Sequence, residues 1–321
     1  MKTKAMFALV VLLACMRATA DSIYVESKGT TLYVIDSNTG ASTRIGLYGK
    51  AGVLSQAFSP AGTLYAVSRG GAAALAQLLT VDLNTGAATV IGNTGVQVEA
   101  LAFTPDGTLY AANFNTNDLY TLNLSTGAAT FVGHLGFSSI MDMAWDPISS
   151  TMYAVASDCA TSHLYSINLI SGAGTLVTDL DNSCLMTLAI DSSNRLLTTD
   201  FSDPNSPLYQ IDPITGSLTN LGPTGLVSTM GATAQPEPRA EIETLKTMVS
   251  NLDLGFGITT SLHKKLAAAL GALQADDTAS ACAALQDFMS EVSAQSGKKI
   301  NSRSASALME YAGAIRTLLG C

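Results

Sequence analysis

The feature that most constrains this 321-residue chain is a pattern that occurs five times. Each copy contains a Thr-Gly or Ser-Gly step, and successive glycines lie 46, 41, 45 and 44 residues apart. The clearest copy, residues 100–133, divides into four apolar segments separated by turn sequences such as Pro-Asp-Gly at 105–107. Proline fixes φ and glycine tolerates positive φ, as tight hairpins require. Four strands per repeat at this period predict the blades of a β-propeller.

The repeat begins out of phase. Residues 22–46 supply only the second, third and fourth strands of a blade, and the missing first strand recurs at 229–236. Pairing the two ends in one blade removes exposed sheet edges. We therefore predict an all-β five-bladed β-propeller of four-stranded blades, closed by the terminal strand, over residues 21–236. The other four blades are expected at 54–92, 99–133, 141–178 and 186–222.

The composition changes near Pro236. The Pro-Glu-Pro segment 236–238 is a stiff break in the chain, because each proline disfavours helix at the residue before it. The following segment has a helical period, with stripes such as Leu262, Leu266, Leu270 and Leu273. We expect a small all-α domain of about four helices over 237–321, with a core of its own. The candidate N-caps are Thr260 or Ser261, Asp277 and Ser302.

Residues 1–20 have the features of a signal peptide. Lysines precede a short apolar run, and Ala18-Thr19-Ala20 forms a small-residue cleavage site. The run is too short for a permanent membrane anchor, and no other stretch is a candidate transmembrane segment. We expect a secreted or periplasmic protein; the alternative is a lipoprotein anchored through Cys15, which follows a lipobox-like Leu-Leu-Ala.

The charge distribution makes nucleic acid a poor partner. The formal net charge is −9, and residues 21–238 carry five Lys or Arg against seventeen Asp or Glu. Nucleic-acid binding depends on neutralising phosphates with basic side chains, which this region lacks.

Four cysteines remain if Cys15 is removed with the leader, and an even number in an exported protein suggests disulfides. Three pairings are conceivable. The repeat phase favours Cys159–Cys184 and Cys282–Cys321, one bridge in each domain. A zinc site has little support, because no CxxC is present and the three histidines are scattered.

Candidate ligand-binding residues lie in the loops that join the fourth strand to the next blade and the second strand to the third, which share one face. These loops are rich in side-chain oxygens and include both Cys159 and Cys184. Such oxygens suit Ca²⁺, but no EF-hand spacing is present and Asn and Asp are common in turns, so we expect no cofactor, with calcium as a weak alternative. The candidates on this face are Asn113, Asn115, Asp118, Asp158, Asp200 and Asp203.

Two acids are weak catalytic candidates. Glu99 and Asp142 begin the first strands of adjacent blades near the axis, where paired carboxylates would serve glycoside hydrolysis. They occupy positions of opposite parity, so their side chains are expected on opposite faces. A third feature of the first strands is a column of small residues that we interpret as filling a narrow axis: Ala57, Ala102, Ala144, Ala189 and Thr233.

The blades resemble NHL-like and quinoprotein-like propellers of secreted bacterial proteins, on the pattern LYxxDxxTGxxxxIG that residues 79–92 approximate. Quinoprotein enzymes carry a tryptophan late in each repeat, whereas this chain has only Trp145, in a different strand; this argues against a bound quinone. The tail resembles the FIMAH domain, through Ser261-Leu262-His263-Lys264-Lys265-Leu266 and the later Gly297-Lys298-Lys299-Ile300. That resemblance implies an accessory, non-catalytic module.

These observations favour an exported, non-catalytic recognition or scaffold protein. Its loop face would bind a glycan or a cell-surface or extracellular protein. The alternatives are a carbohydrate-active enzyme, glycosidase or lyase, that uses Glu99 and Asp142, and a purely structural role.

Overall fold

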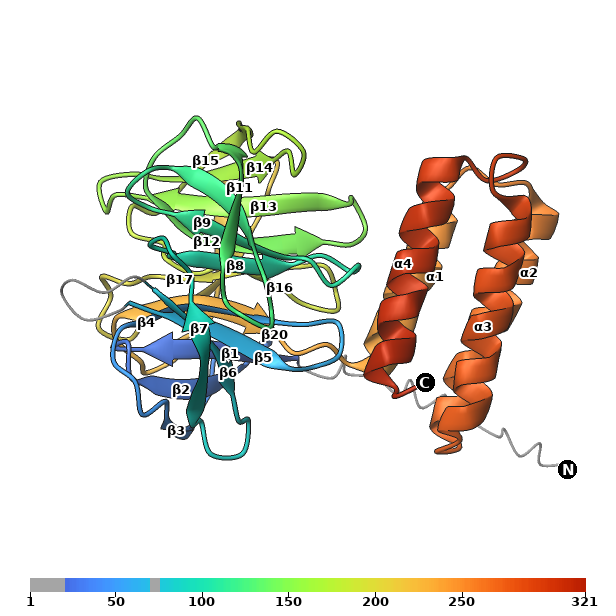
Figure 1. Cartoon of the computed structure of the whole chain (residues 1–321), viewed down its shortest axis with the longest axis horizontal. Helices are drawn as coiled ribbons and strands as arrows, with labels where there is room; N and C mark the ends of the chain where they lie inside the picture. The colour runs from blue at the N-terminus through green and yellow to red at the C-terminus, as the bar shows by residue number, and fades with distance from the viewer. Residues whose placement is uncertain (1–20, 70–75) are drawn as a thin grey trace, which may run out of the picture.

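The computed structural model describes residues 21–69 and 76–321, which form five four-stranded antiparallel sheets and four helices (Figure 1). The predicted five-bladed propeller and helical tail are confirmed. The proposed signal peptide and Cys15 lie outside the described residues.

The blades are numbered along the chain from the blade that contains both ends of the propeller. Blade 1 is β20 (Thr229–Ala234), β1 (Ser22–Ser27), β2 (Thr31–Asp36) and β3 (Ser42–Leu47). Blade 2 is β4 (Val53–Phe58), β5 (Leu64–Ser68), β6 (Gln77–Val81) and β7 (Ala88–Asn93). Blade 3 is β8 (Ala100–Phe103), β9 (Leu109–Asn113), β10 (Asp118–Leu122) and β11 (Ala129–His134). Blade 4 is β12 (Ile140–Asp146), β13 (Thr151–Ser157), β14 (Ser162–Ile167) and β15 (Gly174–Leu180). Blade 5 is β16 (Ala189–Ile190), β17 (Leu196–Thr199), β18 (Leu208–Ile211) and β19 (Leu218–Gly222).

The ring closes as the sequence predicts. Strand β20 pairs antiparallel with β1, in a register that runs from Ile23 opposite Ala234 to Ser27 opposite Thr229. The N-terminal and C-terminal segments of the propeller thus complete one sheet, and the innermost strand of blade 1 is not left missing.

The turn between the third and fourth strands is built in the same way in every blade. In blade 1, Asp36 Oδ1 accepts hydrogen bonds from the backbone N–H groups of Asn38 and Thr39, at 3.0 and 2.9 Å. Such Asx turns explain why aspartate or asparagine stands at this position. The equivalent residues in the other blades are Asp82, Asn123, Asn168 and Asp212.

The glycines of the repeat form the contacts between neighbouring blades. Gly92, at the end of blade 2, lies against the turn of blade 3, and a Cβ atom on it would be only 2.0 Å from the carbonyl oxygen of Thr126. Gly46, Gly133 and Gly222 make the same approach to the next turn around the ring. In blade 4 the backbone of Asp179 takes this place, against Gly216. The motif glycines are therefore required by close backbone packing as well as by turn conformation.

The tail consists of α1 (Pro238–Asn251), α2 (Phe256–Gln274), α3 (Thr278–Gln295) and α4 (Ser302–Leu318), packed around an apolar core of their own. Asp277 is confirmed as an N-cap, because its side chain accepts a hydrogen bond from the N–H of Ser280. The cap of α4 is Asn301, one residue before the predicted Ser302. The prediction of Thr260 or Ser261 was wrong: α2 already begins at Phe256, because buried Ile258 extends its apolar stripe by one turn.

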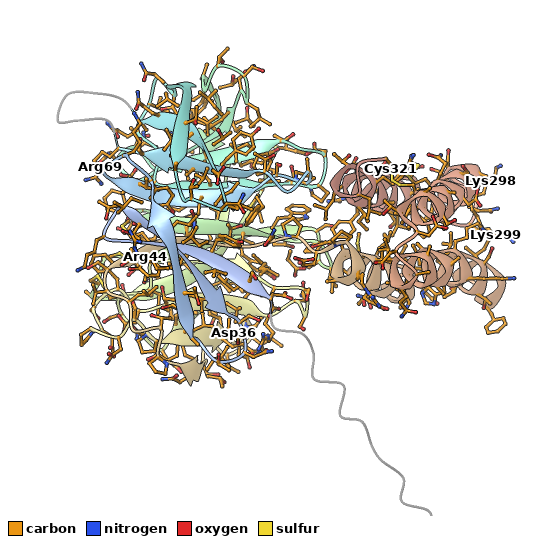
Figure 2. The ribbon with its side chains drawn as sticks, turned by 90° about the horizontal axis from the view of Figure 1, so that it is seen from below. Asp36, Arg44, Arg69, Lys298, Lys299 and Cys321 are labelled. Carbon is orange, nitrogen blue, oxygen red and sulfur yellow. A yellow bond between two sulfur atoms is a disulfide. The ribbon has the colours of Figure 1, made fainter. Side chains whose placement is uncertain are left out.

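The helices lie against the propeller face that carries the loops between first and second strands (Figure 1). Leu318, at the end of α4, approaches Gly62 in one of these loops. Arg69, which follows the second strand of blade 2, is on the side away from the helices, and Lys298 and Lys299 lie at the far end of the tail (Figure 2). The tail therefore leaves the opposite loop face uncovered.

Candidate functional site

The carboxyl group of Asp142 links the inner strands at the centre of the propeller. Asp142 belongs to β12, and its side chain is completely buried. Its Oδ2 accepts hydrogen bonds from the N–H groups of Leu188 and Ala232, each at 2.8 Å, and its Oδ1 accepts one from Ser55 Oγ at 3.0 Å. Ser55 Oγ in turn accepts a hydrogen bond from the N–H of Leu101. These five residues come from five different blades, so one carboxyl group links the whole ring.

Burial raises the pKa of Asp142 from 3.8 to about 8, against the lowering effect of the hydrogen bonds from Ala232, Leu188 and Ser55. Desolvation of the charged form is thus larger than the stabilisation that three donors provide. At neutral pH this carboxyl group is mostly protonated, and each of its oxygens already has a partner.

Glu99 has separate partners. One carboxylate oxygen is 3.3 Å from Arg69 Nη2 and the other accepts a hydrogen bond from the N–H of Phe114 at 3.3 Å. None of these partners binds Asp142. The opposite parity of the two positions predicts separate partners: the Glu99 carboxylate contacts residues that follow the second strands of blades 2 and 3, whereas Asp142 binds the inner strands at the axis.

The polar residues predicted on the loop face mainly shape their own loops. Asn113 accepts hydrogen bonds from the N–H groups of Asn115 and Thr116, and Asp203 accepts one from that of Asn205. Asp158 and Asp200 form Asx turns in the same manner. No group of three or more His, Cys, Asp or Glu is placed to hold a metal ion within residues 21–69 and 76–321. The calcium hypothesis therefore rests on the sequence alone.

Both predicted disulfides are present, Cys159–Cys184 in the propeller and Cys282–Cys321 in the tail. The first ties the loop within blade 4 to the loop that leads into blade 5. Ser157 Oγ adds a hydrogen bond to the carbonyl oxygen of Ser183 between the same two loops. This part of the loop face is consequently cross-linked.

Blades 3 and 4 also carry a cross-strand His–Asp pair at the same repeat position, with the two residue types exchanged. In blade 3, His134 Nδ1 contacts Asp118 Oδ1, and these residues pair across β11 and β10. In blade 4, His163 Nδ1 lies 2.7 Å from Asp179 Oδ1 across β14 and β15. Although burial opposes it, hydrogen bonds from Thr116, His134 and Tyr120 lower the pKa of Asp118, which keeps it ionised beside the imidazole.

Aromatic rings adjoin both pairs. The ring of Phe131, half exposed, packs edge-on against Tyr120 and against His134, with centroids 5.7 and 5.2 Å away. In blade 4, Phe137 stacks on Tyr165 at 3.9 Å. We call these residues the aromatic–histidine surface: Tyr120, Phe131 and His134 in blade 3, with Phe137, His163 and Tyr165 at blade 4. No local pattern in the sequence reveals these pairs, because each His lies 16 residues from its Asp and the two residue types are exchanged; the equivalence follows from the strand register of the two blades.

The second pair extends to a hydroxyl group, because His163 Nε2 is 3.1 Å from Thr161 Oγ1. The order Asp–His–Thr resembles that of a hydrolase triad. However, the Thr161 hydroxyl also donates toward Asp158, at 3.4 Å, and Thr161 is exposed. The arrangement is that of a surface hydrogen-bond network rather than of an activated nucleophile.

Comparison with known proteins assigns no family: no protein-family model and no curated sequence matches the chain. One similar solved structure is a chain of a nidogen/laminin complex, with a TM-score of 0.48 and 11% identity, covering 67% of this chain and 98% of the other. TolB from Acinetobacter baumannii gives a TM-score of 0.43 and 15% identity, covering 68% of this chain and 55% of TolB. The PQQ-bound aldose sugar dehydrogenase from Streptomyces coelicolor gives 0.42 and 15%, covering 68% and 83%. The resemblances to NHL-like propellers and to the FIMAH domain therefore remain predictions.

Proposed function

We propose that this protein is an exported, non-catalytic recognition protein. Its propeller loop face binds a glycan or an extracellular protein, and its helical tail is an accessory module. The observation that carries this proposal is the aromatic–histidine surface on the outer strands of blades 3 and 4, whose His–Asp pairs lie at the strand ends that border the loop face. There, a half-exposed phenylalanine lies beside an oriented imidazole and a carboxylate. Rings with adjacent hydrogen-bonding groups are typical binding anchors, since they combine apolar area with directional contacts.

The rigidity of this face supports the proposal. Asx turns and the Cys159–Cys184 bridge fix the loops before any partner arrives. A preorganised surface loses less conformational entropy on binding. Two disulfides also fit an extracellular or periplasmic location. No helix among residues 21–69 and 76–321 is long and apolar enough to cross a membrane.

The test is a glycan array and a pull-down from surface extracts, with wild type and the double variant Phe131→Ala/His134→Ala. We expect the variant to lose about tenfold or more in affinity, since removing a central anchor costs at least about 1.4 kcal/mol. Phe256→Ala is the matched control, because Phe256 is 87% exposed on the tail. Binding that is equally strong in wild type and double variant, or absent from both assays for wild type, contradicts the proposal.

The enzyme hypothesis is tested separately through Glu99. Exchange of Glu99 for glutamine keeps the size of the side chain and removes its charge toward Arg69. If the protein hydrolyses a polysaccharide and Glu99 is one of the acids, Glu99→Gln should abolish turnover, whereas hydrolysis that survives in this variant removes that assignment.

A further inference from the structure

A second candidate binding site lies beneath the tail, on the propeller face opposite the proposed recognition surface. A cavity of about 170 Å³, partly open to solvent, occupies the mouth of the central axis. Its floor lies at the level of Asp142, through Leu188 and Ala232, and its roof is formed by α1 and α4, through Thr244 and Ala314. Because both domains contribute to the wall, the cavity depends on docking of the tail.

The column of small residues in the first strands explains why space remains there. All five residues of the column line the cavity: Ala57, Ala102, Ala144, Ala189 and Thr233. The sequence predicts that they fill a narrow axis, but the structure leaves its mouth open. Four aromatic residues border the remaining space: Phe58, Phe103, Trp145 and Tyr311. A wall of this kind suits either an apolar group or an organic cation.

The charge of the wall favours the cation. Its charged side chains are the carboxyl groups of Asp191 and Glu241, and no Lys, Arg or His among the described residues lines the cavity. Asp191 is neutralised by Arg195, whose Nη2 lies 2.6 Å from Asp191 Oδ2. Glu241, in α1, forms no ion pair with any residue of 21–69 and 76–321. One carboxyl group of the wall therefore has no counter-ion.

The Glu241 carboxyl group also has a free acceptor. Its Oε2 accepts a hydrogen bond from the Tyr311 hydroxyl of α4, whereas its Oε1 has no hydrogen-bond partner in the described parts of the chain. Burial, with the negative charges of Asp21 and Glu237, raises the pKa of Glu241 from 4.5 to about 7, against the lowering effect of the Tyr311 hydrogen bond. A positive charge beside Oε1 would offset this unfavourable burial of the carboxylate.

The other polar groups of the wall restrict the kind of cation. No group of three or more His, Cys, Asp or Glu in the described ranges is placed to hold a metal ion. A primary ammonium needs acceptors for three N–H groups. However, Gln235 Oε1 and Thr233 Oγ1 already accept hydrogen bonds, from the Tyr24 hydroxyl and the N–H of Phe58. A quaternary ammonium has no hydrogen to donate and needs only a negative charge and apolar contacts.

We propose that this cavity binds a small quaternary ammonium group, whose positive charge is balanced by the Glu241 carboxylate and whose methyl groups contact the aromatic and small apolar residues of the wall. Proteins commonly recognise such cations with aromatic side chains. The size agrees, since a cavity of about 150 Å³ in another protein holds benzene, and tetramethylammonium is of similar size. This role of the tail is independent of recognition by the opposite face.

Isothermal titration calorimetry of the purified protein with tetramethylammonium chloride tests the proposal. We expect saturable binding that sodium chloride at equal concentration does not reproduce. The fluorescence of Trp145, the only tryptophan, should change in parallel, because this residue lines the cavity. tert-Butyl methyl ether, a neutral molecule of similar shape, and pivalate, an anion, should each bind at least about tenfold more weakly. Absence of saturable tetramethylammonium binding, or equally strong binding of the ether, overturns the proposal.

Two variants of α1 locate the site. Glu241→Gln keeps the size of the side chain and removes its charge, so the affinity for tetramethylammonium should fall at least about tenfold. Glu243→Gln is the matched control, because Glu243 is exposed on the same helix, pairs with Lys246 and does not line the cavity. Equal affinity in wild type and Glu241→Gln contradicts the proposal. If Glu241→Gln disrupts docking of the tail, the comparison of the cation with the neutral ether on wild type still decides.

The affinity should also depend on pH. The groups that face Glu241 are Tyr311 from α4, Asp21 from the start of the propeller and Glu237 from the linker, so ionisation of Glu241 adds to a negative environment. Between about pH 6 and 8 the Glu241 carboxyl group loses its proton, and the affinity for tetramethylammonium should rise, by up to about tenfold per pH unit below the pKa. Glu241→Gln should flatten this profile. A wild-type affinity that is independent of pH excludes Glu241 as the counter-ion.

Discussion

Replacing Gly92 with alanine is expected to destabilise the propeller by about 3 kcal/mol or more, or to prevent its folding. The new Cβ atom would lie 2.0 Å from the carbonyl oxygen of Thr126 and 2.9 Å from its carbon, and both are backbone atoms of the next blade. Neither can rotate away as a side chain would, so the two blades must separate. Urea denaturation followed by the fluorescence of Trp145, which lies in the propeller, measures the loss.

The matched control is Gly271→Ala in α2, where an added Cβ atom meets nothing within 4 Å. Alanine restricts the unfolded chain and has a higher helix propensity, so we expect the tail to gain about 0.5–1 kcal/mol, measured by circular dichroism. A Gly92→Ala protein as stable as wild type would show that the glycine contacts between blades do not limit packing of the ring.

The second large effect is expected at Asp142. Asp142→Ala leaves three buried donors without an acceptor, the N–H groups of Leu188 and Ala232 and the hydroxyl of Ser55. Each such group costs about 1–3 kcal/mol, so a loss of about 3 kcal/mol or more is expected. Asp142→Asn should lose less, because its carbonyl oxygen can still accept both N–H bonds, whereas its amide faces Ser55 Oγ as a donor and only the Ser55 hydroxyl loses its acceptor.

The free energy of unfolding should depend on pH differently in wild type, with Asp142, and in the Asp142→Asn variant. Between the ordinary pKa of 3.8 and the native value of about 8, Asp142 is protonated in the folded state and ionised in the unfolded state. The folded state thus binds the extra proton, and its stability falls as pH rises through this window, by up to about 1.4 kcal/mol per unit. Asp142→Asn removes this contribution. Identical pH profiles of the free energy of unfolding for wild type and Asp142→Asn would contradict the raised pKa.

Much of the architecture was determined by local sequence. The spacing of the Thr-Gly steps predicts five blades, because each turn needs an Asx residue and a glycine at fixed positions. The displaced first strand at 229–234 predicts the closure with β1, and the repeat phase predicts the Cys159–Cys184 bridge. These are properties of short segments or of their period, which a sequence displays directly.

The tertiary structure decided what those segments bring together. Asp142 follows no motif, and only convergence of five inner strands reveals that it links the ring and cannot ionise freely. His134 and His163 become equivalent only through the pairing of strands in blades 3 and 4. The cavity at Trp145 depends on docking of α4 against the axis. Burial, cross-strand register and contact between domains involve residues distant in the chain, so no local pattern encodes them.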